Sequence, residues 1–291
     1  MHSVFNYNTL QAKLDRSTRT IFVELSRSKN DHSINMEMLF ELESLFAWLT
    51  NKVEIHSVFI TSEQTQTNLF SSGYDTTNIK NYSAKQLEKL TEKLQKIVQA
   101  MQYLPQTIIV DLKKGAKNIG CELAIGADIR IAHQECQLEF NHNKLGLVPS
   151  SSGMSSLSII VGLTHTKNFL LTGKAIKSPM LLNSGFVFDS YSDFNREDTI
   201  NDLLGSIHEQ APVQRIQTKL GAFDLERTKY DQSMKVEKQI SKASFITEDW
   251  KNIKVDLETS KDDNEFMQAK SMSYVTKLTL VKDDNSPDTL N

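Results

Sequence analysis

The sequence predicts an α/β fold that is followed by a C-terminal helical region. Short apolar runs rich in β-forming residues alternate with helical patterns up to about residue 190. From about residue 198 the chain changes to amphipathic helical segments with no clear strand between them. We therefore expect a core over residues 1–190, a helical region over 191–258 and a polar, partly disordered tail over 259–291.

Strands and helices are expected in alternation along the core. The expected strands are 20–25, 57–62, 107–112 and 128–132, and the expected helices are 33–49, 83–104 and 120–127. Ser33 is of the residue type that caps a helix N-terminus, so it is expected to begin the first helix. In the tail, residues 272–281 carry the pattern of one further short strand.

The composition is that of an ordinary soluble domain. The 291 residues carry a net charge of -3, with 39% hydrophobic and 24% charged residues, so no basic surface for nucleic acid or anionic lipid is expected. The two cysteines, Cys121 and Cys136, lack metal-ligand spacing and suit a reducing compartment. No signal peptide and no apolar run of about 18 residues is present, which favours a cytoplasmic protein without membrane insertion or bound metal.

One carboxylate stands in unusual surroundings. Glu122 lies between a glycine and small apolar residues in the segment GCELA. A buried carboxylate is costly unless it is paired or used in chemistry. Glu122 is therefore either a catalytic acid or base, or a helix-start carboxylate that is satisfied by backbone N–H groups and the helix dipole.

Several motifs in the right order resemble the crotonase superfamily of enoyl-CoA hydratases and isomerases. They are NLFSSGYD at 68–75, NIGCELAIGADIRIA at 118–132, KLGLVP at 144–149 and LLTG at 170–173. The resemblance covers roughly residues 18–255. It implies a crotonase-like spiral of ββα units, followed by helices that assemble subunits into a homotrimer or a hexamer built as a dimer of trimers.

The resemblance also implies an acyl-CoA thioester as the ligand, with no separate cofactor because coenzyme A is part of the substrate. Two backbone N–H groups would hold the enolate-like thioester oxygen, and the family positions fall on Ser72 and Ile119. Glu122 falls on the first acid/base of the family. The residues whose positions match the family's acyl-CoA contacts are Asn30, Ser33, Ser71, Gly73, Lys117 and Gly120.

The sequence departs from the family pattern at the site itself. Asn118 and Ile119 replace two of three family glycines, although the backbone N–H of Ile119 survives the change. The second family glutamate is His142 here, so the acid/base pair would be a carboxylate and an imidazole. The alternative for His142 is an ordinary polar loop residue. Three consecutive serines at 150–152 are expected to cap a helix rather than to supply a nucleophile, because no G-x-S-x-G elbow precedes them.

Three functions remain open from the sequence. The first is an acyl-CoA enzyme of fatty acid metabolism, an isomerase, hydratase or lyase in which Glu122 moves a proton beside a stabilised enolate. The second is a non-catalytic binding module that keeps the scaffold while the chemistry has decayed. The third is a structural or regulatory oligomer in which Ile119 plugs the pocket.

Overall fold

A seven-stranded sheet is built from the apolar runs of the core, in the order β1-β2-β3-β4-β5-β7-β10. The computed structural model describes residues 2–3 and 5–252. The strands are β1 (His2–Ser3), β2 (Leu10–Asp15), β3 (Thr20–Leu25), β4 (Ser57–Ser62), β5 (Thr107–Asp111), β7 (Ile129–His133) and β10 (Asp189–Tyr191). The first three strands pair antiparallel, and the strands from β3 to β10 pair parallel.

The central parallel strands are covered on both faces, as their continuous apolar sequences require. Every residue of β4 and β5 is buried. On one face the sheet packs against α1 (Met36–Leu49) and α2 (Ala84–Tyr103). On the other face Phe59 and Ile109 pack against Leu204 of α6 (Arg196–His208).

A second, smaller sheet brings the site segments together. It consists of β6 (Gly115–Lys117), β8 (Gln137–Glu139) and β9 (Ile176–Lys177). The helix α3 (Ile119–Ile125) begins two residues after β6. A bridge between Ser71 and Ala116 ties the loop 69–75 to β6, so this loop and the start of α3 lie side by side.

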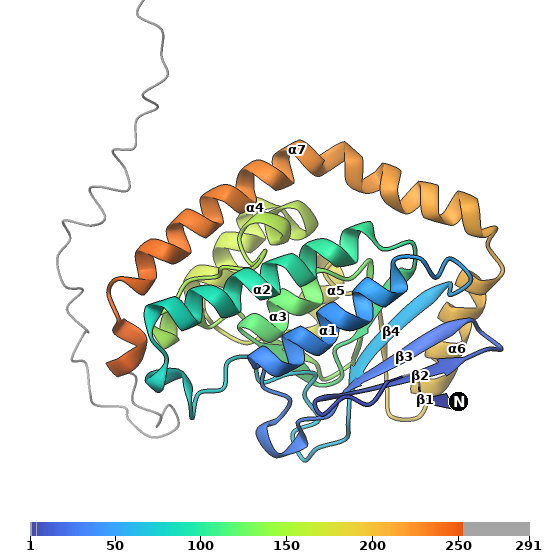
Figure 1. Cartoon of the computed structure of the whole chain (residues 1–291), viewed down its shortest axis with the longest axis horizontal. Helices are drawn as coiled ribbons and strands as arrows, with labels where there is room; N and C mark the ends of the chain where they lie inside the picture. Colours follow the sequence, from blue (N-terminus) through green and yellow to red (C-terminus); the bar gives the residue numbers. More distant parts are fainter. Residues whose placement is uncertain (1, 4, 253–291) are drawn as a thin grey trace, which may run out of the picture. The chain divides into compact units, whose positions relative to one another are not determined.

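The remaining helices follow the small sheet. They are α4 (Ser155–Thr172), α5 (Ser178–Asn183) and α7 (Pro212–Phe245), and the 3-10 helices are η1 (Ser28–Asn30), η2 (Ile79–Asn81), η3 (His142–Leu145) and η4 (Asp249–Asn252). A backbone kink interrupts α4 at Gly162, where φ is 77°. The long helix α7 packs against α2 and α4, and Figure 1 shows it passing over both. No helix in the described part of the chain is long and apolar enough to span a membrane.

Most of the expected elements of the core are confirmed. The strands at 20–25 and 57–62 match β3 and β4 residue for residue, and helix 83–104 matches α2 within one residue at each end. The amphipathic helical segments expected from about residue 198 are the helices α6 and α7. The strands β2, β6 and β8 were not predicted.

The expected cap at Ser33 is wrong. Helix α1 begins at Met36, and the Asn35 side chain accepts the hydrogen bond from the Met38 N–H. The Ser33 hydroxyl instead accepts from Arg27 at 2.8 Å. The described residues belong to one compact unit, and the boundaries expected at 190 and 258 stay predictions. The tail 259–291 and the strand at 272–281 lie outside the described residues.

Candidate active site

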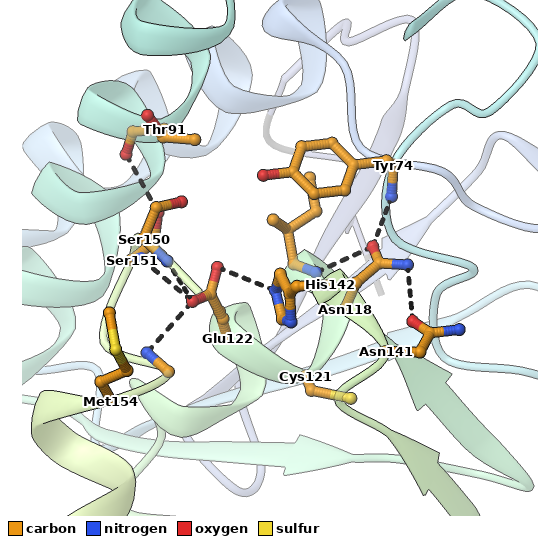
Figure 2. Close-up of polar contacts among 12 residues, drawn as sticks. Tyr74, Thr91, Asn118, Cys121, Glu122, Asn141, His142, Ser150, Ser151 and Met154 are labelled. Carbon is orange, nitrogen blue, oxygen red and sulfur yellow. Dashed lines mark hydrogen bonds and ion pairs between the residues drawn. The ribbon is translucent and has the colours of Figure 1, made fainter. Parts of the chain in front are cut away.

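Glu122 lies in the first turn of α3 and has no exposed surface. Its Oε1 accepts three backbone hydrogen bonds, from Ser150 at 2.8 Å, Ser151 at 3.0 Å and Gly153 at 3.1 Å. Figure 2 shows these donors converging on the carboxylate from the loop before α4. The charge of Glu122 is therefore balanced by N–H groups of a distant loop, which leaves Oε2 without a hydrogen-bond partner among the described residues.

The loop 150–154 is shaped around this carboxylate. A Cβ on Gly153 would lie 2.4 Å from Glu122 Oε1, so only glycine allows this approach. The expectation that Ser150–Ser152 cap a helix is wrong, because Met154 occupies the N-cap of α4 without a side-chain bond. Ser150 and Ser151 serve the site through their backbone N–H groups, and the loop reverses at Ser152, where φ is 88°.

A second buried carboxylate holds the same loop from the other side. Glu237 of α7 accepts hydrogen bonds from the N–H groups of Met154 at 3.2 Å and Ser155 at 3.0 Å, and from the Ser155 hydroxyl at 2.6 Å. Burial and then the charge of Glu122 raise the pKa of Glu237 to about 7. Helix α7 is thereby coupled to the loop that orients Glu122.

His142 meets Glu122 as the sequence predicted. Its Nε2 lies 3.5 Å from Glu122 Oε2, and the imidazole has no exposed surface. Neither ring nitrogen makes a hydrogen bond within the described part of the chain. The pair therefore presents a carboxylate oxygen and two imidazole nitrogens without hydrogen-bond partners among the described residues.

Tyr74 completes this cluster and was missed by the sequence analysis. Its ring stands edge-on to His142, with centroids 6.4 Å apart and planes at 89°. Its buried hydroxyl lies near Ser150 and makes no hydrogen bond of normal geometry. Burial, with the charge of Glu122 second, raises the pKa of Tyr74 well above its ordinary value, so the phenol keeps its proton at neutral pH.

Two backbone N–H groups converge on a single oxygen atom. The N–H of Tyr74 donates to Asn118 Oδ1 at 2.7 Å, and the N–H of Ile119 donates to the same atom at 2.9 Å. Figure 2 shows this carboxamide between the Tyr74 backbone and the start of α3. Such a pair of fixed donors has the geometry that stabilises a developing oxyanion.

The expected donor Ser72 is wrong, and Tyr74 takes its place. The Ser72 N–H is used in a 2.8 Å bond to the Asp31 carbonyl oxygen. Gly73 has a φ of 81°, so the chain reverses there and the next N–H, that of Tyr74, faces α3. The side chain of Ile119 is buried in the hydrophobic core, and the atom that fills the site belongs to Asn118.

The six residues expected to contact acyl-CoA lie in the loop 69–75 or beside it. Lys117 N–H donates to Ser71 O at 3.0 Å, and a Cβ on Gly120 would lie 2.9 Å from Ser71 Cβ. On the other side of the loop, Asn30 O accepts from the Ser33 N–H at 2.9 Å and from the Ser72 hydroxyl at 3.1 Å. Gly73 lies between these contacts. The fold gathers all six, and their contact with coenzyme A stays a prediction.

The described residues include no group of three or more His, Cys, Asp and Glu side chains that could hold a metal ion.

Comparison with known proteins identifies the family. The family described as enoyl-CoA hydratase/isomerase matches residues 15–264. The chain therefore belongs to this family, within the crotonase superfamily, and its ββα core and C-terminal helices are those of a crotonase fold.

Curated relatives and solved structures agree with this assignment. A short-chain-enoyl-CoA hydratase of Clostridium acetobutylicum is 24% identical over 239 residues, 82% of this chain and 91% of that protein. A crotonyl-CoA hydratase of Syntrophomonas wolfei is 22% identical over 238 residues, with the same 82% and 91% coverage. The solved enoyl-CoA hydratase of Bacillus halodurans has a TM-score of 0.77 at 19% identity, and the match covers 84% of this chain and 98% of that one.

Proposed function

We propose that this protein binds an acyl-CoA thioester and moves a proton beside its carbonyl group, as a hydratase, isomerase or lyase of the enoyl-CoA type. The observation that carries the proposal is the convergence of the Tyr74 and Ile119 N–H groups on one carbonyl-type oxygen. A thioester oxygen at that position would be stabilised as it gains charge, in surroundings that exclude water. Coenzyme A is part of this substrate, so the reaction needs no separate cofactor.

The acid/base groups in this proposal are Glu122 and His142. Glu122 takes a proton from the carbon next to the thioester carbonyl, and the electron pair of the broken C–H bond passes to the oxygen held by the two N–H groups. Because Oε1 is fixed by three N–H donors, Oε2 is the oxygen that handles the proton. The proton then returns to a carbon atom of the substrate, either directly from Glu122 or through the His142 imidazole, whose Nε2 lies 3.5 Å from Glu122 Oε2.

The relatives suggest which substrates to try first. The names of the Clostridium and Syntrophomonas relatives specify a short-chain-enoyl-CoA and crotonyl-CoA, respectively. Since the second family glutamate is His142 in this chain, isomerisation of a 3-enoyl-CoA is as good a candidate as hydration of a 2-enoyl-CoA.

A second candidate is a non-catalytic binding module, and one observation favours it. Both N–H donors are already used by Asn118, and neither Glu122 nor His142 has exposed surface. A protein that retained only the scaffold would tolerate a closed site of this kind.

Turnover separates the two candidates. The wild-type protein and Glu122→Gln are assayed for hydration of crotonyl-CoA and isomerisation of 3-enoyl-CoA thioesters. Glutamine keeps an oxygen for the three N–H donors but cannot take a proton, so we expect turnover to fall by about 10²- to 10⁴-fold. Absence of turnover with every thioester would replace the enzyme proposal with the binding module. Equal turnover in the variant and the wild type would instead remove Glu122 as the catalytic base.

Assembly and location form part of the same proposal. We propose a cytoplasmic homotrimer or dimer of trimers, supported by the family relationship and by the absence of a membrane-spanning helix within the described residues. Light scattering of the purified protein would give the subunit number, and a stable monomer would contradict this assembly.

A further inference from the structure

We infer that the side chain of Asn118 is an internal occupant of the thioester-oxygen site, which a substrate must displace before it can bind productively. The inference rests on the proposed function, since it takes the Tyr74 and Ile119 N–H groups as that site. It assigns to Asn118 a role in gating the site and in selecting ligands by their acyl oxygen.

The Asn118 side chain offers the N–H groups the same kind of acceptor as the thioester that would displace it. A carboxamide oxygen and a thioester oxygen are both carbonyl acceptors, and each backbone N–H has a single hydrogen to donate. Asn118 Oδ1 takes both hydrogens, at 2.7 Å from Tyr74 N and 2.9 Å from Ile119 N. A thioester oxygen therefore competes with Asn118 for both bonds.

The other end of the carboxamide is also fixed. Asn118 Nδ2 donates to Asn141 Oδ1 at 3.2 Å, and Asn141 Nδ2 donates to Glu139 Oε2 at 3.2 Å. Glu139 in turn lies 3.4 Å from Lys117 Nζ, whose side chain is 42% exposed. Asn141 Oδ1 requires a donor, and the two backbone N–H groups require an acceptor. Only one orientation of the Asn118 amide satisfies both, with Nδ2 toward Asn141 and Oδ1 toward the N–H groups.

The backbone at Asn118 carries a cost that these bonds offset. Its φ is 36° and its ψ is −115°, a conformation that glycine adopts far more easily than a residue with a side chain. The facing residue also makes room, because a Cβ on Gly73 would lie 1.8 Å from Asn118 Oδ1. The geometry thus combines a strained backbone and a side-chain-free neighbour to place one oxygen atom in the site.

The effect on affinity follows from the two bonds that must be exchanged. Removing the occupant should tighten binding of an acyl thioester by between about 5-fold and 150-fold, as two net hydrogen bonds imply. Free CoA has no thioester oxygen, so its affinity should not change. Ligands that carry a full negative charge on the acyl oxygen should displace Asn118 more readily than neutral ones.

The test is calorimetric titration of three proteins with acetoacetyl-CoA and with CoA. In Asn118→Gly the occupant is gone and the backbone is relaxed, so acetoacetyl-CoA should bind about 5- to 150-fold more tightly than to the wild type. Asn118→Asp is the matched control, because its carboxylate still offers an oxygen to both N–H groups. Its affinity for acetoacetyl-CoA should equal that of the wild type or fall below it.

Two failures can be told apart. In the first, acetoacetyl-CoA binds equally to the wild type and to Asn118→Gly, and more tightly than CoA in both. That result would overturn the inference that Asn118 occupies the site, while the proposed function stands. If acetoacetyl-CoA binds no better than CoA in every protein, the proposed function falls and takes the inference with it.

Asn141→Ala gives a second test that leaves the backbone at position 118 unchanged. It removes the bond that anchors Nδ2, so the carboxamide is held at one end only. A gain in acetoacetyl-CoA affinity smaller than that of Asn118→Gly, with unchanged affinity for CoA, is expected. Affinity equal to that of the wild type would overturn the role assigned to this anchor and weigh against a gate held at both ends.

Discussion

The carboxylate of Glu122 and the imidazole of His142 meet 3.5 Å apart in the interior, and neither side chain has exposed surface. The two come from different elements, α3 and η3, which the fold brings together. Three backbone N–H groups fix one oxygen of the carboxylate, so its other oxygen faces the imidazole. This arrangement gives the site one carboxylate and one imidazole where two carboxylates were the family expectation.

Replacing His142 by glutamine should lower turnover. Glutamine fills similar space but cannot exchange a proton, so we expect kcat/KM to fall by about 10²-fold or more. His165→Gln on α4 is the control, and it should leave kcat/KM unchanged. A kcat/KM of His142→Gln equal to that of the wild type would rule out proton exchange at His142.

Tyr74→Phe separates the hydroxyl from the backbone N–H. Deleting a buried hydroxyl that makes no normal hydrogen bond should leave the stability unchanged or raise it by up to ~1 kcal/mol, as measured by denaturant unfolding. The backbone donor remains, so acetoacetyl-CoA affinity should hold while turnover falls about 10-fold or more if the phenol assists proton transfer. Unchanged turnover would limit the role of Tyr74 to its N–H.

Gly153→Ala should disturb Glu122 directly. The new Cβ would lie 2.4 Å from Glu122 Oε1, so the loop must shift and its N–H bonds must lengthen, with a loss of about 1–3 kcal/mol in unfolding free energy. Gly221→Ala is the matched control, because Gly221 lies inside α7 with nothing within 4 Å of its added Cβ. That substitution should stabilise the protein by about 0.5–1 kcal/mol. Equal effects of the two substitutions would show that the loop does not need glycine.

Glu237→Gln should alter how stability depends on pH. The folded-state pKa of Glu237 is raised from 4.5 to about 7, so between these values the folded protein holds a proton that the unfolded chain has lost. The contribution of Glu237 to the unfolding free energy should therefore be fully present below pH 4.5 and fall as pH rises toward 7, by up to about 3 kcal/mol.

The glutamine variant should lose this decline. Glu226→Gln, at an exposed position on the same helix, serves as the control and should keep it. Thermal unfolding of the three proteins across this pH range decides the matter. A decline of the same size in Glu237→Gln would assign it to other groups.

The hydrophobic periodicity of the sequence predicted those strands and helices whose formation depends on residues close together in the chain. The strands β3 and β4 and the helix α2 follow from runs of apolar residues with the period of each element. Ser33 and Asn35 are both of residue types that cap helices. The Ser33 hydroxyl accepts a hydrogen bond from Arg27, and Asn35 caps α1.

The motifs indicated which acid and base residues meet at the site, but they did not indicate which backbone N–H groups face it. Glu122 and His142 come together as the motifs indicated. Which N–H of the loop 69–75 faces α3 depends on the φ of 81° at Gly73, and a motif does not reveal it. The contact of Asn118 with Tyr74 spans 44 residues. Its only signal in the sequence is an asparagine at a position where the family has glycine.

The most direct test of the account is a crystal structure of the Asn118→Gly protein with acetoacetyl-CoA. The account predicts the acyl oxygen within about 3.2 Å of both the Tyr74 and the Ile119 nitrogen, in the place of the absent carboxamide. An acyl oxygen bound elsewhere, with these two N–H groups turned to other partners, would contradict it.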